Sequence, residues 1–220
     1  MLVSYSQPHI PNSEYSNTME HSIAYCARVS NPANQNNCET DERLLKYLIK
    51  HNHWSPFEMV SICLEINSTR DICRQILRHR SFSFQEFSQR YADATIIGFE
   101  SRERRLQDAK NRQNSFITDD TNLLNAWDQK QQEVLELSKN TYEWALTNGI
   151  AKEQARSVLP EGMTHSRMYM NGTLRSWMHY IQLRTGNGTQ KEHREVALSC
   201  AKTIASIFPM ILDFVTLSNV

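Results

Sequence analysis

Hydrophobic residues recur at helical spacing in several segments of the chain. A clear short example is 41–51, where Leu44, Leu45, Leu48 and Ile49 form one apolar stripe. Combined with start and stop signals, this spacing predicts helices over residues 41–51, about 69–78, 118–148, 151–158, 174–184 and 190–208.

The longest predicted helix, 118–148, is followed directly by Gly149, which favours a helix end. We expect its apolar residues to form the face that packs on the rest of the protein. They are Leu124, Trp127, Val134, Leu135, Leu137, Tyr142 and Leu146. The helix near 69–78 has Ser68 or Thr69 as its N-cap.

Three segments have the composition of strands or extended loops. Residues 59–67 are short and β-branched and predict a strand, while 81–90 and 163–173 predict a strand or a loop. Residues 92–115 are polar and charge-rich, which favours a surface excursion. The sum is an α+β fold that is mainly helical, and a length of 220 residues fits one domain spanning 1–220.

Charge and cysteine content exclude several classes of protein. Lys plus Arg and Asp plus Glu each number 24, so the chain lacks the basic excess of proteins that grip long nucleic acids. The five cysteines lack zinc-site spacing and predict reduced, mostly buried thiols. No metal site is expected, because His51 and His53 alone are insufficient. Without a recognisable signal peptide or membrane-spanning run, we expect a soluble cytoplasmic protein with no membrane partner.

The residues best suited to chemistry are concentrated at 78–90. Here Arg78, Arg80 and Arg90 alternate with aromatic and hydroxyl side chains. Arginine forks donate paired hydrogen bonds to phosphate oxygens and stack on flat rings, so the segment suits a nucleotide. It follows the negative end of a predicted helix, so the arginines must supply the positive charge themselves. The alternative is a solvated charged face beside a half-buried Phe-rich strand.

The spacing in this segment resembles the signature of the flavin-dependent thymidylate synthases, Arg-His-Arg, then seven residues, then Ser-x-Arg. The matching residues are Arg78, His79, Arg80, Ser88 and Arg90. Other segments that resemble this family are CARVSNP (26–32), LLKYLIKHNHWSPFE (44–58), EQARSVLP (153–160) and LRSWMHYIQLR (174–184), the last followed by Gln190 and Glu192. The resemblance implies the family's α+β fold with a small antiparallel sheet, and a homotetramer with active sites at subunit interfaces.

The resemblance also implies an enzyme that methylates dUMP to dTMP, with FAD as cofactor and NADPH and methylenetetrahydrofolate as co-substrates. NADH in place of NADPH stays open. Arg184 would be catalytic, favouring the N3-deprotonated form of the uracil ring. FAD would be contacted by His53, Ser55, Arg78, His79, Arg80, Glu86, Thr173, Arg175 and His179. Substrate would be bound by Gln75, Arg78, Glu86, Phe87, Ser88, Gln89, Arg90, Arg156 and Arg184.

Some positions depart from the family pattern. Many members have an acidic residue near Gly186 and an alanine where Thr189 stands, and Thr173 occupies a position that is often asparagine. These departures bear on side-chain contacts to FAD. Taken singly, the plainer alternatives are a helix C-cap for His53, solvated positions for Arg156 and Arg184, a surface pair for Arg175 and His179, and core packing for Trp177 and Tyr180.

The sequence also bears on mechanism. No cysteine lies beside a histidine or follows a proline, so no cysteine nucleophile is expected. Ser88 has no evident base, and we assign it a binding role. Rossmann and P-loop motifs are absent. Two other classes stay open: a nucleotide- or RNA-binding module that uses the Arg- and Phe-rich segment, and a helical structural protein whose Arg-His-Arg motif caps an interface.

Overall fold

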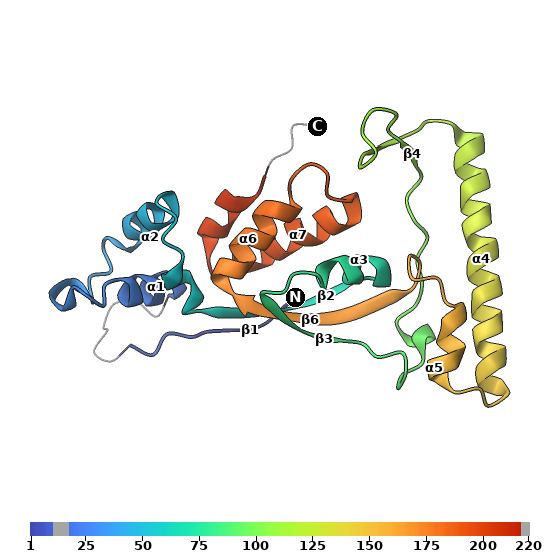
Figure 1. The fold of residues 1–220 in the computed structure, drawn as a ribbon, viewed down its shortest axis with the longest axis horizontal. Coiled ribbons are helices and arrows are strands. Elements are labelled where there is room, and N and C mark those ends of the chain that lie inside the picture. The colour runs from blue at the N-terminus through green and yellow to red at the C-terminus, as the bar shows by residue number, and fades with distance from the viewer. Residues whose placement is uncertain (11–17, 217–220) are drawn as a thin grey trace.

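A computed structural model describes residues 1–10 and 18–216. The helices are α1 (Met19–Ala27), α2 (Asp41–Lys50), α3 (Arg70–Ile76), α4 (Thr121–Thr147), α5 (Lys152–Ala155), α6 (Leu174–Arg184) and α7 (Lys191–Ile204). The strands are β1 (Leu2–Tyr5), β2 (Ser61–Thr69), β3 (Phe82–Glu86), β4 (Arg105–Gln107), β5 (Ser115–Ile117) and β6 (His165–Thr173). The fold is α+β and extended along one axis, with α1 and α2 at one end, the main sheet in the middle, and α4 and α5 at the other end (Figure 1).

The main sheet has the strand order β1-β2-β6-β3, and each neighbouring pair is antiparallel. β2 and β6 pair along their whole length, from Ser61 opposite Thr173 to Thr69 opposite His165. Successive side chains of a strand point to opposite faces, so one face of this pair is apolar. That face carries Ile62, Leu64, Ile66, Met168 and Met170, all buried. It packs against α3, α6 and α7 (Figure 1).

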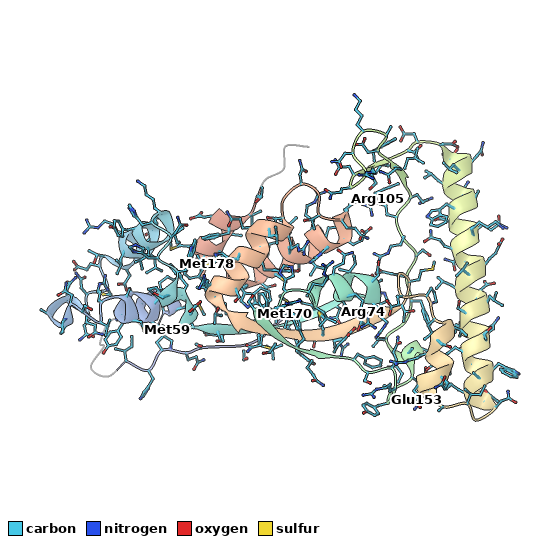
Figure 2. All side chains as sticks on the ribbon, in the orientation of Figure 1. Met59, Arg74, Arg105, Glu153, Met170 and Met178 are labelled. Atoms are coloured by element: carbon cyan, nitrogen blue, oxygen red, sulfur yellow. The ribbon has the colours of Figure 1, made fainter. Side chains whose placement is uncertain are left out.

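α6 carries the aromatic centre of this core. Trp177 is fully buried, and its indole Nε1 donates to the Ile62 carbonyl over 3.0 Å, which satisfies its one polar atom. Tyr180 is 1% exposed, and Phe82 of β3 packs edge-on against Trp177 with ring centroids 4.9 Å apart. The prediction that Trp177 and Tyr180 are core residues is confirmed. Figure 2 labels Met170 on the sheet and Met178 on α6, and both are buried in this core.

Arg102 is one of the residues that join the arm formed by α4 and α5 to the centre of the molecule. Its guanidinium bonds to Thr69 and Asp71, the residues at the start of α3. The backbone N–H of Arg102 donates to Gln131 Oε1 of α4 over 2.6 Å. In turn, Gln131 Nε2 donates to the Arg102 carbonyl. The segment between β3 and α4 therefore fixes the arm relative to the site-bearing helices.

The predicted packing face of the long helix is partly wrong. Within its apolar stripe, Trp127, Val134 and Leu137 are 47%, 48% and 70% exposed, whereas Tyr142 is fully buried. The physical reason is that α4 stands away from the sheet, so only one edge of the stripe meets other parts of the chain (Figure 1). The helix begins at Thr121, where the Asp120 side chain caps it by accepting from the Leu123 N–H.

The other predicted helices and strands are confirmed with shifted ends. α6 matches its prediction in both bounds, whereas α3 ends at Ile76, and α7 ends at Ile204 before a 3-10 turn that starts at Pro209. The cysteine prediction is right in that all five thiols are free, but wrong in that only Cys73 and Cys200 are buried. Among the described residues, no helix is long and apolar enough to cross a membrane.

Candidate functional site

The first group of side chains, called the Arg184 cluster below, lies where the ends of α3, α6 and α7 converge. Arg184, the last residue of α6, donates its Nε–H to His79 Nε2 over 2.8 Å. The His79 ring lies edge-on to Tyr180, with centroids 4.8 Å apart. His193 of α7 contacts both the Tyr180 hydroxyl, at 3.1 Å, and the Gln75 amide oxygen, at 3.2 Å. The structure thus brings together Gln75, His79 and Arg184, three predicted residues.

Burial and one cation set the charge of this cluster. Burial, and then the nearby Arg184 charge, lower the pKa of His79 to about 4. Burial, Arg184 and His79 together lower the pKa of His193 to about 3, and burial raises the pKa of Tyr180 well above its ordinary value. At neutral pH both imidazoles and the phenol are uncharged, so Arg184 supplies the positive charge.

The same cluster continues into the start of α7 and to β4. The Gln75 Nε2 donates to Gln190 Oε1 over 2.8 Å, and Gln190 Nε2 donates to Glu192 over 2.9 Å. Arg105 of β4 forms an ion pair with Glu192. Burial raises the pKa of Glu192, but its hydrogen bonds, including those from Gln190 and Arg105, outweigh this and lower it. In Figure 2, Arg74 of α3 and Arg105 lie on the side that faces α4.

Arg78 and Arg80 flank His79 in the chain, after the end of α3. Both side chains are exposed, and among the described residues neither guanidinium makes a hydrogen bond or ion pair. Most arginines nearer the arm are paired with carboxylates, as Arg102 is with Asp71. Arg78 and Arg80 therefore have donors available for an external anion.

The end of β3 and the segment after it form a second group. Glu86 accepts from Ser166 over 2.7 Å and lies 3.6 Å from the Arg70 guanidinium. Gln89 is 3% exposed, and its Nε2 has no hydrogen-bond partner in the described part of the chain. A buried amide without a partner is costly, so this nitrogen is a candidate ligand donor.

Ser88 and Arg90 belong to a segment that contacts α5, the helix that Arg156 directly follows. Among the described residues, none of the three bonds to the Arg184 cluster. The Arg90 guanidinium lies 5.1 Å from the Tyr91 ring centroid, and the Tyr91 carbonyl accepts from Lys152 Nζ of α5 over 3.2 Å. Arg156 directly follows α5 and donates to the Glu153 carbonyl, near the position of Glu153 in Figure 2. Phe87 is half-buried, and its N–H donates to a carbonyl of β6.

A third group joins the turn after α2 to the start of α6. His53 and Ser55 are exposed. Arg175 forms an ion pair with Glu58, and the His179 ring lies edge-on to Trp54, 4.9 Å away. Burial, followed by Arg175, lowers the pKa of His179.

Thr173, the remaining residue of this third group, is the N-cap of α6. Its hydroxyl accepts from the Ser176 N–H over 3.3 Å. A hydroxyl used for capping has one lone pair fewer for a ligand.

Sequence reasoning missed His193, which stands at the centre of the first group. Its only sequence signal is a histidine three positions after Gln190 on the buried face of α7. The part of the chain that the structure describes contains no group of three His, Cys, Asp or Glu residues arranged to hold a metal ion.

Comparison with known proteins defines the class of this fold and site. In fold, the chain is similar to a UMP/dUMP methylase, PolB, from Streptomyces cacaoi, solved with 5-Br dUMP. The TM-score is 0.79 at 27% identity, covering 97% of this chain and 92% of that one. The family model described as "Thymidylate synthase complementing protein" matches residues 13–210.

Two curated relatives extend the likeness over almost the whole chain. A flavin-dependent thymidylate synthase of Synechocystis sp. is 49% identical, covering 96% of this chain and 95% of the relative. The protein of Paramecium bursaria Chlorella virus 1 named "Probable flavin-dependent thymidylate synthase" is 48% identical, covering 97% of this chain and 98% of the relative. The chain belongs to the family of flavin-dependent thymidylate synthases. This membership favours the enzyme over an RNA-binding module or a structural helical protein.

Proposed function

We propose that the protein forms dTMP from dUMP, with FAD as cofactor and with NADPH and methylenetetrahydrofolate as co-substrates. When bound, the flavin supplies hydride chemistry and the folate supplies the one-carbon unit. The observation that carries the proposal is the half-buried cation Arg184, which donates to His79 in the cluster that also holds Gln75. In the chain, His79 is flanked by Arg78 and Arg80, which have no partner among the described residues. The protein's part is binding, orientation and charge.

The donor set of the first and third groups, together with Glu86 of the second group, fits a flavin dinucleotide. Arg78 and Arg80 have free guanidinium groups for phosphate oxygens, while His53 and Ser55 are exposed and polar. His79, Glu86, Thr173, Arg175 and His179 complete the proposed set. Because Arg175 is paired with Glu58 and Thr173 caps α6, these two would contact FAD only by sharing or exchanging their present partners.

The proposed dUMP site uses Gln75, Arg78, Glu86, Phe87, Ser88, Gln89, Arg90, Arg156 and Arg184. Ser88 and Arg90 would bind the phosphate, and the unpartnered Nε2 of Gln89 supplies a buried donor. Arg184 would lie at the uracil ring. A nearby cation favours the anionic form of an acid, so Arg184 would promote loss of the N3 proton and raise electron density at C5.

No enzyme nucleophile is needed in this proposal. Burial raises the pKa of Cys73 and of Cys200 to about 12, so both stay as thiols, whereas the reactive form of cysteine is the thiolate. Among the described residues, the Ser88 hydroxyl contacts only the Arg90 backbone N–H, which is no base. Ser88 therefore keeps a binding role.

We further propose that the chain acts as one domain and assembles as a homotetramer with active sites between subunits. Two observations support assembly. Among the described residues, no hydrogen bond or ion pair joins the Arg184 cluster to the segment of Arg90 and Arg156. The exposed stripe on α4, Trp127, Val134, Leu137 and Trp144, is apolar and suits a second copy. Sedimentation of the purified protein tests the tetramer, and a monomer at micromolar concentration would refute it.

The experiment that tests the activity is dTMP formation from dUMP by purified protein supplied with FAD, NADPH and methylenetetrahydrofolate. Product should require NADPH, and parallel assays with NADH settle the choice of reductant. If the folded protein binds flavin but forms no dTMP, the synthase assignment is wrong, and the protein is a flavoprotein with another activity.

A further inference from the structure

His193 is buried completely, so it cannot touch a ligand directly, yet it lies in a continuous row of side-chain hydrogen bonds. The row runs from Tyr180 through His193 to Gln75, and then through Gln190 to Glu192. The separations are 3.1, 3.2, 2.8 and 2.9 Å. Each contact has a donor and an acceptor, but amides and imidazoles could in principle point either way.

The carboxylate at the end of the row fixes its direction. Glu192 is ionised and paired with Arg105, so it can only accept, and Gln190 must turn its NH₂ group toward it. Gln190 then presents its oxygen to Gln75, which must donate with Nε2. This leaves the Gln75 oxygen facing His193.

The direction continues to the far end of the row. An amide oxygen only accepts, so His193 must carry its proton on Nδ1. Its Nε2 is then the acceptor for the Tyr180 hydroxyl. Every polar atom of the imidazole is satisfied in this one arrangement.

We propose that His193 is a positioning residue that fixes the amide of Gln75 so that Gln75 offers the substrate an N–H donor and never its oxygen. With the oxygen held by His193 and one N–H used on Gln190, the second N–H of Gln75 has no partner among the described residues. That N–H suits an acceptor oxygen, as on a pyrimidine carbonyl or a phosphate. The inference rests on the proposed function, since it takes dUMP as the ligand of Gln75.

Two amide substitutions at position 193 separate the roles of the two ring nitrogens. In His193→Asn the short amide can donate to Gln75 in place of Nδ1, whereas in His193→Gln the longer amide reaches the Tyr180 side instead. We expect dUMP affinity, measured by calorimetry on the flavin-loaded protein, to stay within about threefold of wild type in H193N. It should fall by about fivefold to tenfold in H193Q, the range of one hydrogen bond. Equal affinity in the two variants would overturn the proposal.

A double substitution shows whether His193 acts through Gln75. Gln75→Ala should weaken dUMP binding by a similar factor, and adding H193Q to it should cause no further loss, because coupled residues are non-additive. Full additivity would contradict the proposal. His165→Leu, a partly buried histidine of β6 outside the cluster, is the matched control and should bind dUMP as wild type does.

A readout that needs no dUMP keeps the inference separate from the proposed synthase activity. In ¹⁵N-histidine NMR spectra of the flavin-loaded protein, His193 should be the neutral Nδ1–H tautomer near neutral pH. The Nε2–H tautomer would overturn the inference even if dTMP is formed. A wild-type protein with the expected tautomer but no dUMP binding would instead overturn the proposed function and, with it, the ligand assigned to Gln75.

Discussion

Arg184 donates its Nε–H to His79 Nε2 over 2.8 Å. Arginine has no acceptor, so His79 must receive this bond with an unprotonated Nε2 and carry its ring proton on Nδ1. The lowering of the His79 pKa to about 4, by burial and then by Arg184, agrees with a neutral ring. His79 thus orients the guanidinium of Arg184 without adding a second charge beside it.

Acid should weaken the fold through His79. Its pKa is about 6.5 in an unfolded chain and about 4 in the fold, so between these values the unfolded state binds the extra proton. The stability that comes from neutral His79 is therefore fully present above about pH 6.5 and is lost as the pH falls toward 4. In His79→Gln, an amide oxygen can accept from Arg184 without titrating. The melting temperature of H79Q should fall less than that of wild type over this range, and identical pH profiles would contradict the assignment.

Arg184→Ala should separate catalysis from flavin binding. Removing the cation proposed to promote N3 deprotonation should lower kcat for dTMP formation by about a hundredfold or more, the range seen when one charge-stabilising group is deleted. FAD content, measured by absorbance after gel filtration, should be close to wild type. Arg112→Ala, on the exposed loop between β4 and β5, is the matched control. Near-normal turnover in R184A would remove Arg184 from the catalytic role.

Arg78→Ala should weaken two ligands together. Its guanidinium has no intramolecular partner in the described chain, so the substitution should leave the melting temperature of the ligand-free protein within about 1–2 °C of wild type. Loss of charge-assisted hydrogen bonds should raise the dissociation constants of both FAD and dUMP by about tenfold or more. Titrating the two ligands separately tests this, because an effect on one alone would contradict a shared contact.

Local sequence patterns predict most elements of this fold but not their packing. α6 is predicted in both bounds from its local sequence, and the structure adds that Thr173 caps its start. The stripe on α4 is equally regular, yet Leu137 is 70% exposed. A periodic pattern predicts that one face of a helix is apolar and favours burial. It does not predict whether this chain or a second chain buries that face.

The candidate site is predictable where it depends on a contiguous motif and not where it depends on long-range contacts. Arg78 and His79 are adjacent in the sequence, and the motif identifies both. His193 contacts Gln75, which lies 118 residues away in the sequence. From the sequence alone, a single histidine on a helix is interpreted as a residue of the hydrophobic core. Only the fold shows that it is a hydrogen-bonding centre and that Arg105 fixes the far end of its row.

Gly172 shows how the fold constrains one of the strands that carry the site. It lies opposite Phe82 in the pairing of β3 with β6, and the Phe82 ring packs over it. A Cβ added at Gly172 would lie 2.6 Å from Phe82 Cε1 and closer still to Cδ1, so the ring would have to move. That ring packs edge-on against Trp177 and Tyr180, with centroids 4.9 and 6.0 Å away, so its movement would disturb two buried side chains.

Gly172→Ala should therefore lower the free energy of unfolding by about 1–3 kcal/mol, the usual cost of overpacking a core. Gly162→Ala is the matched control, because an added Cβ there would meet nothing nearer than Asp71 Oδ2 at 3.9 Å. Urea unfolding of both variants at equal protein concentration measures the difference. Because β3 leads from His79 to Glu86, the shift of Phe82 should also weaken FAD retention in G172A. If G172A matched G162A in both stability and flavin content, the Phe82 ring would not be the fixed wall that this packing implies.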